Sequence, residues 1–280
     1  MDRTQTSTFL RGTEIEIVNP DIVRGRYQSV LFDFDGTLSL IREGWPEVMI
    51  PMMVEILAQT PTHEPEDELH RIVESFVMRL NGRQTIYQMI QLCKEIAKRG
   101  GKPDDPLVYK RSYYDRLNRR ISGRIEGLRN GSIAREEMLL PGSTALLEEL
   151  RRRGMALYLA SGTDEPYMKE EVRLLDLTDY FNGGMFGALD DYQRFSKKLL
   201  IENMFRRHGL HGPELLAFGD GFVEIENTKE VGGTAIGVAS DEVRRCGVNQ
   251  WKRNRLIGAG ADMILPEYRQ YEALLAYLFP

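Results

Sequence analysis

Cysteine is scarce in this 280-residue sequence, which contains only Cys93 and Cys246. Two cysteines this far apart exclude a disulfide-stapled scaffold and offer no zinc-ligand spacing. Long apolar runs are missing as well, since none approaches the roughly 18 residues that a bilayer-spanning helix needs. The first residues, Met-Asp-Arg-Thr-Gln-Thr-Ser, lack the apolar stretch of a secretory signal peptide. We therefore expect a cytoplasmic protein without a membrane partner.

Neither sign of charge is in large excess. Lysine and arginine number 37, aspartate and glutamate number 42, and the net charge is −5. This mild acidity argues against a partner held through nucleic-acid phosphates, so we expect none. The chain is 42% hydrophobic, which is enough for a sizeable core and excludes a disordered chain. At about 150 residues per domain, the length suggests one large domain or two, and it leaves the oligomeric state open.

The stretch from Pro46 to about Ile133 has a helical pattern. Apolar residues recur there at three- and four-residue spacing, as in Met49 and Met53, and prolines and glycines interrupt the pattern. Such a pattern predicts several amphipathic helices, and no part of it resembles a strand of a parallel sheet. We expect an all-helical domain at residues 40–139.

The rest of the chain alternates short apolar runs with helical patterns. The predicted strands are 29–34, 155–160, 215–218, 234–239 and 263–265, and the predicted helices include 143–153, 170–175, 198–208 and 225–231. This alternation predicts an α/β fold with right-handed crossovers, a doubly wound, Rossmann-like parallel sheet built from residues 1–39 and 140–280. Residues 13–28 are expected to form a half-exposed hairpin, and 182–187 a glycine-rich segment.

Polar residues follow three of the predicted strands. The three segments are Asp33-Phe34-Asp35-Gly36-Thr37, Ser161-Gly162-Thr163-Asp164 and Gly219-Asp220-Gly221, the last followed by Glu224. Since the carboxyl ends of parallel strands meet at one edge of the sheet, these groups should line one cleft, with Lys197 nearby. Several carboxylates that close together need a cation between them. Their hard oxygens suit Mg²⁺, which also accepts phosphate oxygens.

The two aspartates of the first segment differ in what they can do. Asp33 can attack phosphorus as a nucleophile. Asp35, two residues later, can protonate the leaving alkoxide and afterwards activate water. Gly36 permits the sharp turn that brings both side chains toward the cleft. The pattern therefore favours phosphoryl transfer.

The order of these motifs resembles that of the haloacid dehalogenase superfamily: DFDGT, then SGT after a strand, then lysine, then GD followed by an acid. The resemblance covers the whole chain, with the helical insert similar to a C1-type cap and the segment 139–143 similar to phosphoglycolate phosphatase-like and β-phosphoglucomutase-like members. It implies that Asp33 is the nucleophile and a Mg²⁺ ligand. Asp35 would be the acid/base and would give its backbone carbonyl to the metal. Asp220 would complete the metal site.

The same resemblance implies a phosphate-binding set. Ser161 and Lys197 would hold the phosphoryl oxygens, and Thr37 and Gly162 belong to the same motifs. Lys198 is an alternative to Lys197, which we favour because it precedes the helix and can point back into the cleft. The last acid departs from the pattern: this chain has Glu224 where aspartate is usual. Its longer side chain would reach the metal through water.

We expect Mg²⁺-dependent hydrolysis of a small phosphomonoester metabolite, such as a sugar phosphate, through an aspartyl-phosphate intermediate. Dehalogenation needs only the first aspartate, so Asp35 favours a phosphatase. One alternative is a sugar phosphomutase, which would keep the phosphoryl group on Asp33 until the substrate reorients. Another is a non-catalytic binding or regulatory protein on this fold. The sequence does not identify the substrate.

One candidate for substrate contact lies in the helical insert. The segment 81–85 breaks two amphipathic helices and places Arg83 beside an amide and a hydroxyl at a helix start. Donors gathered at such a position can meet a hydroxylated or anionic ligand. The alternative is a polar turn between helices, in which Asn81 and Gly82 serve as the stop signal.

Overall fold

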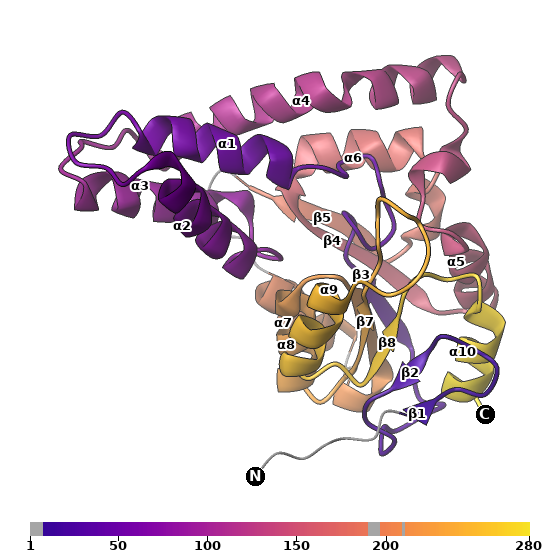
Figure 1. Ribbon diagram of the computed structural model, residues 1–280. Helices are drawn as coiled ribbons and strands as arrows, with labels where there is room; N and C mark the ends of the chain where they lie inside the picture. Colours follow the sequence, from indigo (N-terminus) through magenta and orange to yellow (C-terminus); the bar gives the residue numbers. More distant parts are fainter. Residues whose placement is uncertain (1–7, 190–196, 209–210) are drawn as a thin grey trace, which may run out of the picture.

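The protein is seen here as a computed structural model that describes residues 8–189, 197–208 and 211–280. Within these residues one eight-stranded sheet has the order β1-β2-β8-β7-β6-β3-β4-β5 (Figure 1). Its six parallel strands are β3 (Ser29–Phe32), β4 (Ala156–Asp164), β5 (Gly184–Ala188), β6 (Leu215–Gly219), β7 (Thr234–Val238) and β8 (Met263–Leu265). Two short antiparallel strands, β1 (Thr8–Phe9) and β2 (Glu16–Ile17), extend one edge.

The central strand β3 is buried on both faces. Val30 and Phe32 belong to one apolar cluster, which includes residues of α5 (Ser143–Arg152), α6 (Glu165–Leu174) and α10 (Tyr271–Leu278). Leu31 belongs to another, with residues of α7 (Lys197–His208). On that second side lie also α8 (Phe222–Glu230) and α9 (Gln250–Gly258). A parallel sheet covered on both faces explains why the strand is a continuous apolar run.

Four helices form a separate lobe between β3 and β4 in the chain. They are α1 (Pro46–Leu57), α2 (Glu66–Arg79), α3 (Thr85–Lys98) and α4 (Pro106–Asn130), and Figure 1 shows them projecting from the sheet. The long α4 has clear end signals. The Asp105 carboxylate accepts a hydrogen bond from the Leu107 amide at 2.8 Å, and Gly131 ends the helix with a φ of 78°. We call α1–α4 the helical cap.

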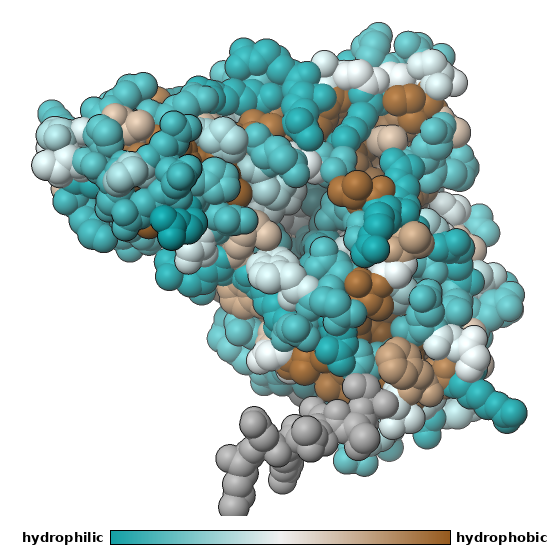
Figure 2. Space-filling model, viewed as in Figure 1, coloured by the Kyte–Doolittle hydropathy of each residue, from teal (hydrophilic) through white to brown (hydrophobic). Residues whose placement is uncertain are grey.

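The chain enters and leaves the cap through two segments that lie side by side. The Leu40 amide donates to Met138 O at 2.9 Å, and the Leu140 amide donates to Leu38 O at 2.8 Å. The predicted boundaries at 39/40 and 139/140 fall within this paired stretch and stay a prediction. Figure 2 shows the surface hollowed between the cap and the sheet domain.

The predicted fold class, a doubly wound parallel sheet with an inserted helical cap, is confirmed, and three details differ. The hairpin predicted at 13–28 lies earlier, between β1 and β2, because the amides of Val18 and Asn19 donate to Asp262 O beside β8. The glycine-rich segment 182–187 contains most of strand β5. Helix α9 was not expected. In addition, Ser161 and Thr163 lie within the last part of β4, where its register with β5 shifts.

Candidate active site

Residues from several strand ends meet the cap at a cavity of about 90 Å³. The sheet domain contributes Asp33, Asp35, Gly36, Gly162, Thr163, Lys197, Asp220 and Glu242 to its wall. The cap and the segment leading to it contribute Arg42, Trp45, Met49, Asn81, Gly82, Arg83, Thr85, Gln88 and Tyr113. The two aspartates of the first motif therefore lie in one cavity wall with Lys197 and Asp220, where the strand-end rule placed them.

Asp33 is buried and directly paired with the predicted lysine. Its Oδ1 accepts a hydrogen bond from Lys197 Nζ at 2.7 Å. Burial raises the pKa of Asp33 to about 6, and the charges of Asp220 and Asp35 add to that rise, while the ammonium of Lys197 opposes it. Three carboxylates thus lie close together, and at Asp33 the charge of Lys197 offsets part of their repulsion.

The two adjacent lysines have different surroundings. Lys197 is buried and also contacts the carboxylate of Glu224, which is itself 1% exposed. Lys198 points elsewhere and pairs with Glu230 at 2.6 Å on the surface. Of the two candidates for phosphate binding, only Lys197 lies at the cavity. Glu224 is not part of the cavity wall, and within the described residues its Oε2 is buried without a hydrogen-bond partner.

Asp35 is held by two hydroxyl groups of β4. Its Oδ2 accepts from Thr163 Oγ1 at 2.8 Å and from Ser161 Oγ at 3.2 Å. Its Oδ1 is buried without a hydrogen bond from the described residues, 3.8 Å from Arg42 Nε. Ser161, predicted to bind phosphate, therefore contacts Asp35 in this state. Thr37, another predicted substrate contact, lies behind the wall, where its hydroxyl accepts from the Asp220 amide at 3.0 Å.

Two charged residues of the cavity region were missed from the sequence. Lys252, from α9, donates to Asp220 Oδ2 at 2.8 Å, to Glu242 Oε1 at 2.7 Å and to Ser240 Oγ at 3.2 Å. Ser240 Oγ in turn donates to Gly36 O at 2.9 Å. Burial alone would lower the pKa of Lys252, but the two carboxylates raise it. This lysine therefore ties Asp220 to the turn that carries Asp35.

A sequence signal existed for one of these residues. Glu242 follows the predicted strand 234–239 closely, so the strand-end rule that marked the other motifs applies to it as well. Lys252 carries no such signal, because it lies in a helix that the sequence did not predict.

Arg42 is a third charged residue that was missed. It lies 4% exposed in the segment entering the cap, and its guanidinium binds Glu171 with Nη2–Oε1 at 2.7 Å and Nε at 3.1 Å from both oxygens. Glu171 is 3% exposed. Burial raises the pKa of Glu171, and the charge of Arg42 opposes that rise. The pair joins the cap entrance to α6 next to Asp35.

Arg42→Met should lower the free energy of unfolding by about 3–5 kcal/mol, because it leaves the Glu171 carboxylate buried without its partner. The double variant Arg42→Met/Glu171→Leu should recover most of this loss. Arg116→Met breaks the exposed pair with Glu55 and is the control, with an expected change below about 1 kcal/mol. Urea unfolding measures all three, and wild-type stability in Arg42→Met would contradict the interpretation.

Arg83 lies where two cavities meet. It belongs to the wall of the cavity of about 90 Å³ and to that of a neighbouring cavity of about 350 Å³. Its guanidinium carbon is 5.8 Å from the ring centre of Tyr87 in the cap and 5.8 Å from that of Phe222 in the sheet domain. The predicted position at the cavity is thus found, while a role in substrate choice stays a prediction.

The donor set at the cavity fits a single Mg²⁺ ion. As the side chains stand, the described residues include no group of three or more His, Cys, Asp or Glu that could hold a metal. Magnesium needs fewer, because it usually keeps several waters and takes one or two carboxylates together with substrate phosphate oxygens. Asp33 and Asp220 offer two such carboxylates on one wall. A cation there would also relieve the repulsion that helps raise the pKa of Asp33.

None of the helices formed by the described residues is both long enough and apolar enough to span a bilayer.

Comparison with known proteins agrees with this architecture. A 5'-nucleotidase of Pseudomonas aeruginosa is 27% identical over 225 residues, which are 78% of this chain and 88% of that protein. A crystal structure of a predicted phosphoglycolate phosphatase from Haemophilus somnus has a TM-score of 0.58 at 17% identity, covering 89% of this chain and 98% of its own. A β-phosphoglucomutase from Clostridium difficile has a TM-score of 0.58 at 12% identity, covering 90% and 97%. The two structures show the shared fold.

A family model described as haloacid dehalogenase-like hydrolase matches residues 27–232, which span most of the chain. The match includes all four motifs and the whole helical cap. The prediction of a hydrolase is confirmed. The chain belongs to the haloacid dehalogenase-like hydrolases.

Proposed function

We propose that the protein is a Mg²⁺-dependent phosphatase that hydrolyses a small phosphomonoester through an aspartyl-phosphate intermediate. The observation that carries the proposal is the contrast between two aspartates in one cavity. Asp33 is paired with Lys197 Nζ, whereas Asp35 is held by the hydroxyl groups of Ser161 and Thr163. Different partners favour different roles for the two carboxyl groups.

In the first step, a carboxylate oxygen of Asp33 attacks phosphorus and the bond from phosphorus to the ester oxygen breaks. Protonated Asp35 gives its proton to the departing alkoxide. In the second step, Asp35 takes a proton from water, whose oxygen attacks the phosphorus of the intermediate and frees the Asp33 carboxylate. Lys197 supplies positive charge beside the attacking oxygen throughout.

Asp33, Asp220 and the backbone carbonyl of Asp35 would hold Mg²⁺, which when bound supplies positive charge to the phosphoryl oxygens. Lys252 and Ser240 would keep Asp220 and the turn at Gly36 in place for that role.

The cavity continues toward a second one at the loop between α2 and α3. The cavity of about 90 Å³ and the neighbouring cavity of about 350 Å³ share Arg83 in their walls, so a leaving group too large for the first would extend past Arg83 into the second. Because one relative is a 5'-nucleotidase, nucleoside monophosphates belong among the candidates beside sugar phosphates.

Phosphate release from a panel of several dozen phosphometabolites, with Mg²⁺ present, tests the proposal. Hydrolysis of one group of small esters without added sugar bisphosphate is the expected result. A strict need for a bisphosphate, with isomerised product and no free phosphate, would indicate a phosphomutase instead. No turnover of any ester would overturn the enzymatic proposal.

Removal of divalent metal should abolish turnover. We expect no phosphate release in EDTA, full recovery with excess Mg²⁺, and inhibition when Ca²⁺ replaces it, because Ca²⁺ takes more ligands in a looser geometry. The assay uses the best substrate of the panel. Undiminished activity in EDTA would refute the metal-dependent mechanism while leaving the phosphatase assignment standing.

A further inference from the structure

The loop between α2 and α3, residues 80–84, is pressed against the catalytic motifs. We call it the cap loop. A Cβ at its Gly82 would lie 3.0 Å from the Cα of Gly221, and a Cβ at Gly162 would lie 3.0 Å from Arg83 O. Gly82 also has a φ of 91°, which favours glycine. The loop backbone therefore packs directly on the last part of β4, which carries Ser161, and on the segment that carries Asp220.

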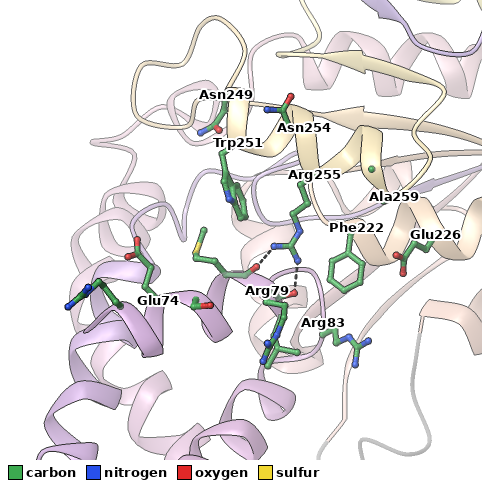
Figure 3. A pocket seen from close by; sticks show the side chains of 15 residues that line it. Glu74, Arg79, Arg83, Phe222, Glu226, Asn249, Trp251, Asn254, Arg255 and Ala259 are labelled. Atoms are coloured by element: carbon green, nitrogen blue, oxygen red, sulfur yellow. Dashed lines mark hydrogen bonds between the residues drawn. The ribbon is translucent and has the colours of Figure 1, made fainter. Parts of the chain in front are cut away.

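The outer side of the cap loop faces open space. A groove of about 1300 Å³ runs there between α2 and the helices α8 and α9 (Figure 3). Arg79 and Arg83 line it from the cap side, and Phe222, Trp251 and Arg255 from the sheet domain. The cap loop contacts the motif glycines on its inner side and borders the groove on its outer side, so it has room to move away from the site.

Arg255 reaches across this groove and binds the backbone of the C-terminal end of α2 and of the cap loop. Its guanidinium donates to Arg79 O at 2.7 Å (Figure 3). It also donates to Asn81 O at 3.0 Å and to Met78 O. Carbonyl groups at a helix C-terminus have no partner within the helix and form the negative end of its dipole. A planar guanidinium with five N–H groups can bind several of them at once.

Two aromatic rings flank the Arg255 guanidinium. Its guanidinium carbon lies 4.7 Å from the ring centre of Phe222 and 5.2 Å from that of Trp251, so the two aromatic side chains support it. With the residues that the structure describes, its hydrogen bonds all go to the carbonyl groups at positions 78, 79 and 81, and it forms no ion pair.

We propose that Arg255 is a positioning residue that holds the cap loop over the phosphate site and thereby helps to select the leaving group. The inference rests on the proposed phosphatase function. Asn81 and Arg83 of the cap loop line the catalytic cavity, whereas Asp33 and Lys197 stand on the sheet domain. Loss of Arg255 should therefore weaken contacts to the leaving group and spare the phosphoryl chemistry.

Limited trypsin digestion probes the loop without any substrate. Trypsin cleaves after Arg79, whose own carbonyl group Arg255 binds, and after Arg83, two residues beyond Asn81. In Arg255→Met we expect cleavage after these two residues to accelerate about ten-fold, since lost hydrogen bonds to a charged group raise the open fraction. Arg255→Lys should fall between. Arg244→Met, in the segment before α9, removes an exposed arginine that pairs with Asp241 and should digest like the wild type. Mass spectrometry identifies the cleavage sites.

Kinetics then test the effect on selection. Arg255→Met should raise KM for the best natural ester about ten-fold, with kcat within about two-fold, and leave p-nitrophenyl phosphate kinetics unchanged. Arg255→Lys should restore part of KM. Wild-type digestion rates, or equal losses on both substrates, would overturn the inference. If the wild-type protein hydrolyses no ester, the proposed function fails instead, and the digestion still decides whether Arg255 holds the loop.

Discussion

Asp33→Asn is expected to reduce phosphate release by about 10⁴-fold or more, because an amide cannot attack phosphorus. The fold should survive. Asparagine has nearly the same shape as aspartate. The substitution also removes a carboxyl group whose charged form is disfavoured by burial, as the raised pKa of Asp33 indicates. Lys197 keeps its contact with Glu224.

The measurement pairs phosphate release with thermal unfolding of the purified variant. A loss of activity at unchanged Tm assigns the effect to chemistry. The wild-type protein, quenched in acid during turnover of a ³²P-labelled ester, should carry label on the peptide with Asp33, and Asp33→Asn should carry none. Near wild-type release from the variant would remove Asp33 from the nucleophile role.

Asp35→Asn should show a loss that depends on the leaving group. For an alkyl phosphate we expect phosphorylation of Asp33 to slow by about 10²–10⁴-fold, because the alkoxide then departs without a proton. For p-nitrophenyl phosphate the same step should slow less than about ten-fold, since that leaving group departs as a stable anion. The asparagine retains one oxygen that can accept from Thr163.

Single-turnover kinetics separate this step from the second one. Asp35→Asn should release p-nitrophenol rapidly once and then stall with phosphate on Asp33, because water activation also needs Asp35. Equal slowing of the first step for both esters would argue against the acid role. A variant that never accumulates the phosphoenzyme would argue against the base role.

The sheet and the first residues of the site were predictable because both follow from the geometry of a parallel sheet. An apolar run such as Val30–Phe32 needs cover on both faces, and alternating helices provide it, so a parallel sheet followed from the sequence. Parallel strands align their carboxyl ends, which brings Asp33 and Asp220 together although 187 positions separate them. No statement about individual side chains was needed for that step.

The parts that were missed are those in which a tertiary contact replaces the local signal. Helix α9 buries only Lys252 and Leu256, so it shows almost no apolar stripe, and its charged residues bind Asp220 and the end of α2. Strand β5 is glycine-rich and lies at the sheet edge, where pairing with β4 defines it. Arg42 belongs to no motif, and its position depends on the ion pair with Glu171, which follows it by 129 residues.

The position of β3 in the sheet has a consequence for how the chain folds. Ser29 pairs with Ala156 on one side and with Leu215 on the other, positions that follow it by 127 and 186 residues. Closing such long loops is slow, whereas the cap helices contact neighbours close in sequence. During synthesis, the apolar central strand thus leaves the ribosome well before either partner, and the cap can fold while that strand still waits unpaired. The insertion that completes the site therefore also delays the pairing of the central strand.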